Sequence, residues 1–120
     1  MPNNPIVLVV EDEPLLLLHA CDVVRDAGFD PVPASNADEA IRILETRTDI
    51  RIVFTDVDMP GSMDGIRLAA AVRGRWPPIE FLVVSGFRDV KLSELPDHSR
   101  FFSKPYDSQK IMDALVEMAA

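Results

Sequence analysis

Acidic, hydroxyl and amine side chains follow four short apolar runs in this sequence of 120 residues. Glu11 and Asp12 come directly after the first run, and Asp56 comes after the second. Two later runs are followed by Ser85 and Lys104. Carboxylates that lie close together raise one another's pKa values unless a cation offsets their charge. The pattern therefore predicts an oxygen-rich site of the kind that Mg²⁺ prefers.

Phosphoryl transfer is the chemistry that this set of residue types supports. Mg²⁺ and the Lys104 ammonium would stabilise the oxygens of a phosphoryl group, and the Ser85 hydroxyl would donate a hydrogen bond to it. The nucleophile is expected to be a carboxylate, because the reactive side chains of Cys21 and His19 fall inside a predicted helix. Asp56 is the best candidate, with an acyl phosphate as the covalent species.

The apolar runs have the length and composition of buried strands. Residues 6–10, 51–55 and 80–84 are rich in β-branched and large apolar side chains, which predicts strands covered on both faces. Residues 100–103 form a fourth strand, and residues 30–33 a fifth. Because residues 30–33 include two prolines, we place this strand at an edge of the sheet.

Amphipathic stretches alternate with these strands. They predict helices that begin and end with the residues usual at helix ends, at 14–27, 36–48, 64–75 and 107–118. Residues 89–95 form a weaker candidate of at most two turns. Alternation of this kind predicts an α/β domain with a parallel sheet and helices on both faces. The carboxyl ends of its strands would bring the five residues of the predicted site to one edge.

Composition limits the class of protein. Hydrophobic residues make up 48% and charged residues 27% of the chain, which predicts one domain with a core and fits neither disorder nor a membrane span. The formal net charge of −8 disfavours direct binding of nucleic acid. The single cysteine suits a reducing compartment, so we expect a cytoplasmic protein without a second domain.

Four segments resemble the signatures of the receiver domain of two-component response regulators. They are residues 7–14, 54–60, 83–85 and 104–105, in the family's order and spread over the chain. Each segment alone is a weak signal, but four in order are a strong one. The resemblance implies a flavodoxin-like (βα)5 fold whose five-stranded parallel sheet has the order 2-1-3-4-5. It also implies a stand-alone receiver that acts in a phosphorelay.

The resemblance assigns roles to the site residues. Asp56 would accept a phosphoryl group from a phosphohistidine of a histidine kinase or a histidine phosphotransfer protein. Mg²⁺, with Mn²⁺ as an alternative ion, would be held by Glu11, Asp12 and Asp56 and by the main-chain carbonyl of Asp58. Ser85 and Lys104 would be the catalytic side chains. Phosphorylation would be self-catalysed, so the chain would not be a turnover enzyme.

Further roles follow from the same resemblance. Ser85 and Phe101 would form the conformational switch, and the Lys104–Pro105 peptide bond would be cis. Phosphorylation would thereby change a surface that binds a downstream protein, which the sequence does not name. Phe101 lacks the hydroxyl of the tyrosine often found at this position, so its switching would act through packing.

Positions beside the site are expected to modulate it. Asp58 and Phe87, each two residues beyond a central site residue, would tune the lifetime of the acyl phosphate. Leu15 and Leu18 lie on the outer face of the first predicted helix, next to the site. They would either receive the kinase's helices or pack locally.

Two alternative functions share parts of this pattern. Asp56 and Asp58 could be the acid pair of a haloacid-dehalogenase-type phosphatase, but that pair normally ends the first strand and here it would end the third. The chain could also be an inactive scaffold with a receiver fold. Because every chemically important position is filled, the scaffold is the weaker interpretation.

Overall fold

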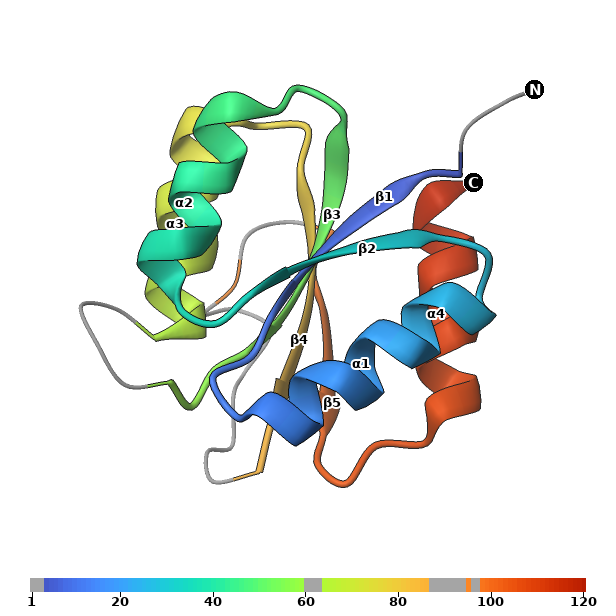
Figure 1. Ribbon diagram of the computed structural model, residues 1–120. Coiled ribbons are helices and arrows are strands. Elements are labelled where there is room, and N and C mark those ends of the chain that lie inside the picture. The colour runs from blue at the N-terminus through green and yellow to red at the C-terminus, as the bar shows by residue number, and fades with distance from the viewer. Residues whose placement is uncertain (1–3, 60–63, 87–94, 96–97) are drawn as a thin grey trace.

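Five parallel strands form one sheet at the centre of the molecule (Figure 1). The computed structural model describes residues 4–59, 64–86, 95 and 98–120. The sheet order is β2-β1-β3-β4-β5, as expected. The strands are β1 (Ile6–Val10), β2 (Asp30–Ala34), β3 (Ile50–Asp56), β4 (Glu80–Ser85) and β5 (Arg100–Ser103).

Helices cover both faces of the sheet. Helices α2 and α3 lie on one side, and α1 and α4 lie on the other (Figure 1). Within the described residues the helices are α1 (Pro14–Asp26), α2 (Ala37–Thr46), α3 (Gly65–Arg75) and α4 (Ser108–Ala119). None of these helices is long and apolar enough to cross a membrane. The short helix expected at 89–95 lies outside the described residues, apart from its last residue.

Strand β1 shows why these runs are continuously apolar. Leu8 and Val10 point into the cluster beneath α2 and α3, and Val7 and Val9 point into the cluster beneath α1 and α4. All four side chains are at most 1% exposed. Successive strand residues face opposite sides, so a strand covered on both faces needs apolar residues throughout.

The helix ends match the residues expected there. Pro14 opens α1, and the chain after α1 passes through Gly28 at a φ of +96°, a conformation that glycine adopts without strain. The side chains of Asn36, Asp64 and Asp107 accept hydrogen bonds from backbone N–H groups in the first turns of α2, α3 and α4. These caps fix where each helix begins relative to the strand before it.

Several boundaries differ from the sequence prediction, most of them by one residue. Helix α2 ends at Thr46, two residues early, because Arg47 is extended and its guanidinium pairs with both carboxylate oxygens of Asp49. Strand β3 is one residue longer at each end than predicted. Asp56 is consequently the last residue of β3 and belongs to the sheet. The sheet therefore holds its backbone in place.

Candidate functional site

The carboxylates of Glu11 and Asp56 lie at the carboxyl ends of adjacent central strands. Val10 pairs with Thr55 in the β1–β3 register, so the next residue of each strand lies at the same edge. Glu11 is 6% exposed and Asp56 is 4% exposed. The Glu11 N–H extends the sheet by donating to the carbonyl of Ala34. The backbone of both residues is therefore fixed by the sheet, at the carboxyl ends of its central strands.

Asp12 completes an acidic cluster with these two residues. One carboxylate oxygen from each of Glu11, Asp12 and Asp56 lies within 4.8 Å of the others. Burial raises the pKa of Glu11 to about 7, with further contributions from a hydrogen bond with Asp12 and from the charge of Asp56. Three converging carboxylates are a donor set that fits a hard divalent cation, which would relieve their repulsion.

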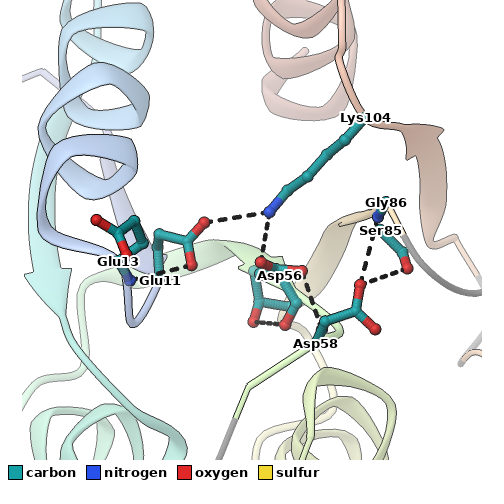
Figure 2. A network of polar contacts seen from close by, with 8 residues as sticks. Glu11, Glu13, Asp56, Asp58, Ser85, Gly86 and Lys104 are labelled. Atoms are coloured by element: carbon teal, nitrogen blue, oxygen red, sulfur yellow. Dashed lines mark hydrogen bonds and ion pairs between the residues drawn. The ribbon is translucent and has the colours of Figure 1, made fainter.

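Lys104, the residue directly after β5, contacts both buried carboxylates. Its Nζ lies 2.5 Å from Asp56 Oδ2 and 3.2 Å from Glu11 Oε1 (Figure 2). Burial lowers the pKa of Lys104, but its hydrogen bonds and ion pairs with these carboxylates outweigh that effect and raise the pKa above its ordinary value. The Lys104 backbone N–H donates to the carbonyl of Ser85, and the following bond to Pro105 is cis.

Asp58 links Asp56 to the end of β4. Its backbone N–H donates to Asp56 Oδ1 at 2.9 Å. Its side-chain Oδ2 accepts a hydrogen bond from Ser85 Oγ at 2.7 Å and lies 3.3 Å from the nitrogen of Gly86 (Figure 2). Lys104 and the Asp58 backbone therefore contact different oxygens of Asp56. Sequence reasoning assigned Asp58 a main-chain role and a position near the site, but not this contact with Ser85.

Gly65, the first residue of α3, is a second feature that sequence reasoning missed. A β-carbon at this position would lie 2.3 Å from the carbonyl oxygen of Asp56 and 2.8 Å from Cα of Val57. The Gly65 N–H donates to the Val57 carbonyl. Close packing of α3 against the end of β3 therefore requires glycine at position 65. In the sequence, the signal for this close packing is the presence of a glycine directly after the capping residue Asp64.

An apolar pocket of about 260 Å³ adjoins the acidic cluster. Leu16, His19 and Tyr106 line it, and Glu11 and Asp56 border it. The rings of His19 and Tyr106 stack with centroids 6.0 Å apart, so Tyr106 connects α1 to the chain after β5. Burial raises the pKa of Tyr106. The pocket was not expected from the sequence, because its walls come from segments far apart in the chain.

The remaining residues singled out in the sequence lie around this centre. Phe101 is half-buried and packs against the cluster beneath α2 and α3. Leu15 and Leu18 are 74% and 63% exposed on α1. Phe87 lies outside the described residues. The structure thus brings together the acidic cluster, Lys104, Ser85 and Asp58, and leaves the two leucines open to solvent.

A family model for the response regulator receiver domain matches residues 7–116 of this sequence. The chain belongs to this family. The receiver domain matches solved structures of the same kind. It superimposes on a response regulator receiver protein from Sinorhizobium medicae with a TM-score of 0.86 and 27% identity, covering 96% of this chain and 94% of that one.

Two further matches involve proteins named CckA. The receiver is 32% identical to the sensor kinase CckA of Brucella abortus over 98% of its own length and 13% of that protein's. It also matches the solved receiver domain of a hybrid histidine kinase CckA, with a TM-score of 0.80, 26% identity, and 96% and 99% coverage. The chain thus spans only a small part of the curated sensor kinase that it matches.

Proposed function

We propose that this receiver domain accepts a phosphoryl group on Asp56, in a Mg²⁺-dependent reaction, from a phosphohistidine of a histidine kinase or histidine phosphotransfer protein. The observation that carries the proposal is the buried Asp56 carboxylate, which lies in an acidic cluster and contacts the Lys104 ammonium. A carboxylate that is buried, fixed by the sheet and paired with a cation is arranged to act as a nucleophile. Membership of the receiver family supports the same assignment.

The transfer forms one bond and breaks one. A carboxylate oxygen of Asp56 attacks phosphorus in line with the phosphorus–nitrogen bond of phosphohistidine. That bond breaks, the imidazole nitrogen keeps its electron pair, and an oxygen–phosphorus bond forms the acyl phosphate. The product carries a new cluster of negatively charged oxygens at the edge of the sheet.

The residues around Asp56 each have a part in this step. Lys104 holds Asp56 through Oδ2 and offsets negative charge on the transferring group. Glu11, Asp12, Asp56 and the main-chain carbonyl of Asp58 would hold Mg²⁺, with Mn²⁺ as an alternative ion. The bound ion would supply positive charge to the phosphoryl oxygens. Ser85 would donate its hydroxyl hydrogen to one of those oxygens.

Ser85 and Phe101 would carry the signal away from the site. Phe101 lies in β5 and pairs with Val83, which is two residues before Ser85 on β4. A movement of Ser85 toward the phosphoryl group would change the packing available to this half-buried ring. We infer that the altered surface binds a downstream protein rather than nucleic acid, because the net charge is −8.

The exposed leucines of α1 supply a surface for the phosphoryl donor. Leu15 and Leu18 lie one and four residues after Pro14, on the helix that follows Glu11 and Asp12. We infer that the helices of the kinase or phosphotransfer protein dock here, which would place a phosphohistidine close to Asp56. The buried Cys21 thiol, in a chain with a single cysteine, suits a reducing compartment, so we place this reaction in the cytoplasm.

Acetyl phosphate provides a direct test without the unknown donor. The wild-type protein, incubated with acetyl phosphate and Mg²⁺, should gain about 80 Da in intact-mass spectrometry. Asp56→Asn should gain nothing, and wild type with a chelator should gain much less. Absence of an adduct on wild type, or an adduct of equal yield on Asp56→Asn, would contradict the proposal. Steady release of phosphate without an adduct would instead indicate a phosphatase.

A further inference from the structure

The side chain of Asp58 occupies hydrogen-bond donors at the end of β4. Its Oδ2 lies 2.7 Å from Ser85 Oγ and 3.3 Å from Gly86 N. Figure 2 shows this carboxylate turned toward Ser85 and Gly86, while Lys104 reaches Asp56 from another direction. Ser85 itself is 2% exposed and Asp58 is half-buried, so their contact is partly shielded from water. Shielding strengthens a hydrogen bond to a charged acceptor.

These same donors face the space beyond Asp56. In the β3–β4 register Asp56 pairs with Val84, so Ser85 and Gly86 continue along the strand next to it. A phosphoryl group on Asp56 would bring three acceptor oxygens into this space. A hydroxyl and an amide have one hydrogen each to donate. When the Ser85 hydroxyl or the Gly86 amide donates a strong hydrogen bond to Asp58, it therefore cannot donate an equally strong one to the phosphoryl group.

Negative charge prevents the Asp58 carboxylate and a phosphoryl group on Asp56 from sharing these donors. A phosphoryl group carries between one and two negative charges near neutral pH, in addition to the charge of the Asp58 carboxylate. The Asp58 backbone N–H is hydrogen-bonded to Asp56 Oδ1, so its carboxylate stays within the same small region unless its side chain rotates away. Like charges at this separation repel each other. Phosphorylation would therefore require the contact between Asp58 and Ser85 to break.

We propose that the Asp58 carboxylate competes with the phosphoryl group for the Ser85 hydroxyl and the Gly86 amide. It thereby stabilises the unphosphorylated receiver. This inference rests on the proposed function, in which Asp56 is the phosphoacceptor. Asp58 is a positioning residue here, because its side chain acts through Ser85. Removing the carboxylate should release Ser85 and favour the phosphorylated conformation.

Beryllofluoride, which mimics the phosphoryl group on a carboxylate, measures this competition without turnover. At saturating Mg²⁺, Asp58→Ala should bind beryllofluoride about tenfold more tightly than wild type, as expected for release of a hydrogen bond to a charged group. Asp58→Asn, which keeps an acceptor without the charge, should show a smaller gain. Asp49→Ala removes an acidic side chain before β3, at the opposite end of the strand from Asp56, and should leave the affinity unchanged.

A double-mutant cycle separates the contact with Ser85 from the general effect of charge. In a Ser85→Ala background, Asp58→Ala should raise beryllofluoride affinity several-fold less than in wild type, because the hydroxyl is already gone and only the Gly86 amide and the charge effect remain. An equal gain in both backgrounds, or no gain in the single variant, would overturn the inference. Failure of wild type to bind beryllofluoride with Mg²⁺ would instead contradict the proposed function.

An amide resonance reports the contact itself. The Gly86 N–H faces a carboxylate, so its proton resonance should move upfield in Asp58→Ala and remain in place in Asp49→Ala. Addition of beryllofluoride to wild type should also perturb it, as the amide changes acceptor. An unchanged Gly86 resonance in Asp58→Ala, in a spectrum that is otherwise folded, would show that Asp58 does not hold this donor and would overturn the inference.

Discussion

The charge of Glu11 depends strongly on its surroundings. This residue is nearly buried, it lies close to Asp12 and Asp56, and Lys104 offsets only part of the negative charge. Burial is the main cause that raises its pKa to about 7, far above the ordinary value for a glutamate. A divalent cation held by this cluster would therefore compete with a proton for the Glu11 carboxylate near neutral pH.

Binding of Mg²⁺ should consequently weaken as the pH falls. The carboxylate of Glu11 loses its proton above about pH 7 and keeps it below. The apparent affinity should thus drop about tenfold between roughly pH 8 and pH 6. Calorimetric titration with Mg²⁺ across this range measures the change. Glu11→Gln should bind more weakly throughout and show little pH dependence, and an equally steep dependence in that variant would contradict the assignment.

Lys104 should have opposite effects on metal binding and on phosphorylation. Its ammonium contacts two of the carboxylates expected to hold the cation, so it repels the cation and competes for the same oxygens. Lys104→Met should bind Mg²⁺ several-fold more tightly, yet its phosphorylation by acetyl phosphate should slow by about 100-fold, because charge on the transferring group is no longer offset. Mg²⁺ titration and the initial rate of adduct formation measure the two effects.

An exposed lysine provides the control for that variant. Lys110 lies on α4 and is exposed, so Lys110→Met makes the same chemical change away from the acidic cluster. It should leave both Mg²⁺ affinity and phosphorylation at wild-type values. A parallel loss of metal binding and phosphorylation in Lys104→Met would indicate that the side chain supports the fold of the site rather than the charge balance within it.

At the scale of elements, the junction between β3 and α3 fixes the position of Asp56. Helix α3 begins so close to the end of β3 that a β-carbon on Gly65 would overlap the carbonyl of Asp56. Gly65→Ala should therefore lower the free energy of unfolding by about 2 kcal/mol and slow phosphorylation by displacing Asp56. Urea denaturation followed by circular dichroism measures the first effect, and adduct formation measures the second.

The second glycine of α3 makes a matched control. A β-carbon on Gly74 would meet no atom within 4 Å. Gly74→Ala should thus raise the free energy of unfolding by about 0.5 kcal/mol, because alanine restricts the unfolded chain and favours the helix. It should leave phosphorylation unchanged. Equal stability changes of the same sign in both variants would contradict the close packing at Gly65.

Strands and helices could be predicted from the sequence where a single local feature determines them. Each central strand needs continuous apolar residues because both faces are covered, and the prolines at 31 and 33 identify an edge, so the strands and the edge strand were found from the sequence. The same reasoning brought Glu11, Asp56 and Lys104 to one end of the sheet. The close approach at Gly65 and the contact between Asp58 and Ser85 were not found, because both depend on how the chain after β3 turns back toward its neighbours.

At the scale of the whole molecule, the acidic cluster adjoins one open apolar region. The carboxyl ends of β1, β3 and β4 meet there, α1 starts beside them, and the pocket lined by Leu16 and Tyr106 borders Asp56. Leu15 and Leu18 lie on the same helix as Leu16 and are exposed to solvent. Under the proposed function, a donor protein that docks on α1 would lie close to Asp56, whereas acetyl phosphate needs no such surface.

Replacing both exposed leucines should separate docking from chemistry. Leu15→Ala combined with Leu18→Ala should change the free energy of unfolding by no more than about 0.5 kcal/mol, because these side chains are mostly in solvent. Phosphorylation by acetyl phosphate should stay at the wild-type rate. Transfer from a phosphorylated histidine kinase that phosphorylates wild type should slow by about tenfold or more, as expected for loss of apolar contact area.

Val116→Ala, which shortens an exposed apolar side chain on α4, should leave both reactions unchanged. Equal transfer rates for the double variant and wild type would place the docking surface elsewhere, and equal losses with both phosphoryl donors would mean that the leucines support the site itself.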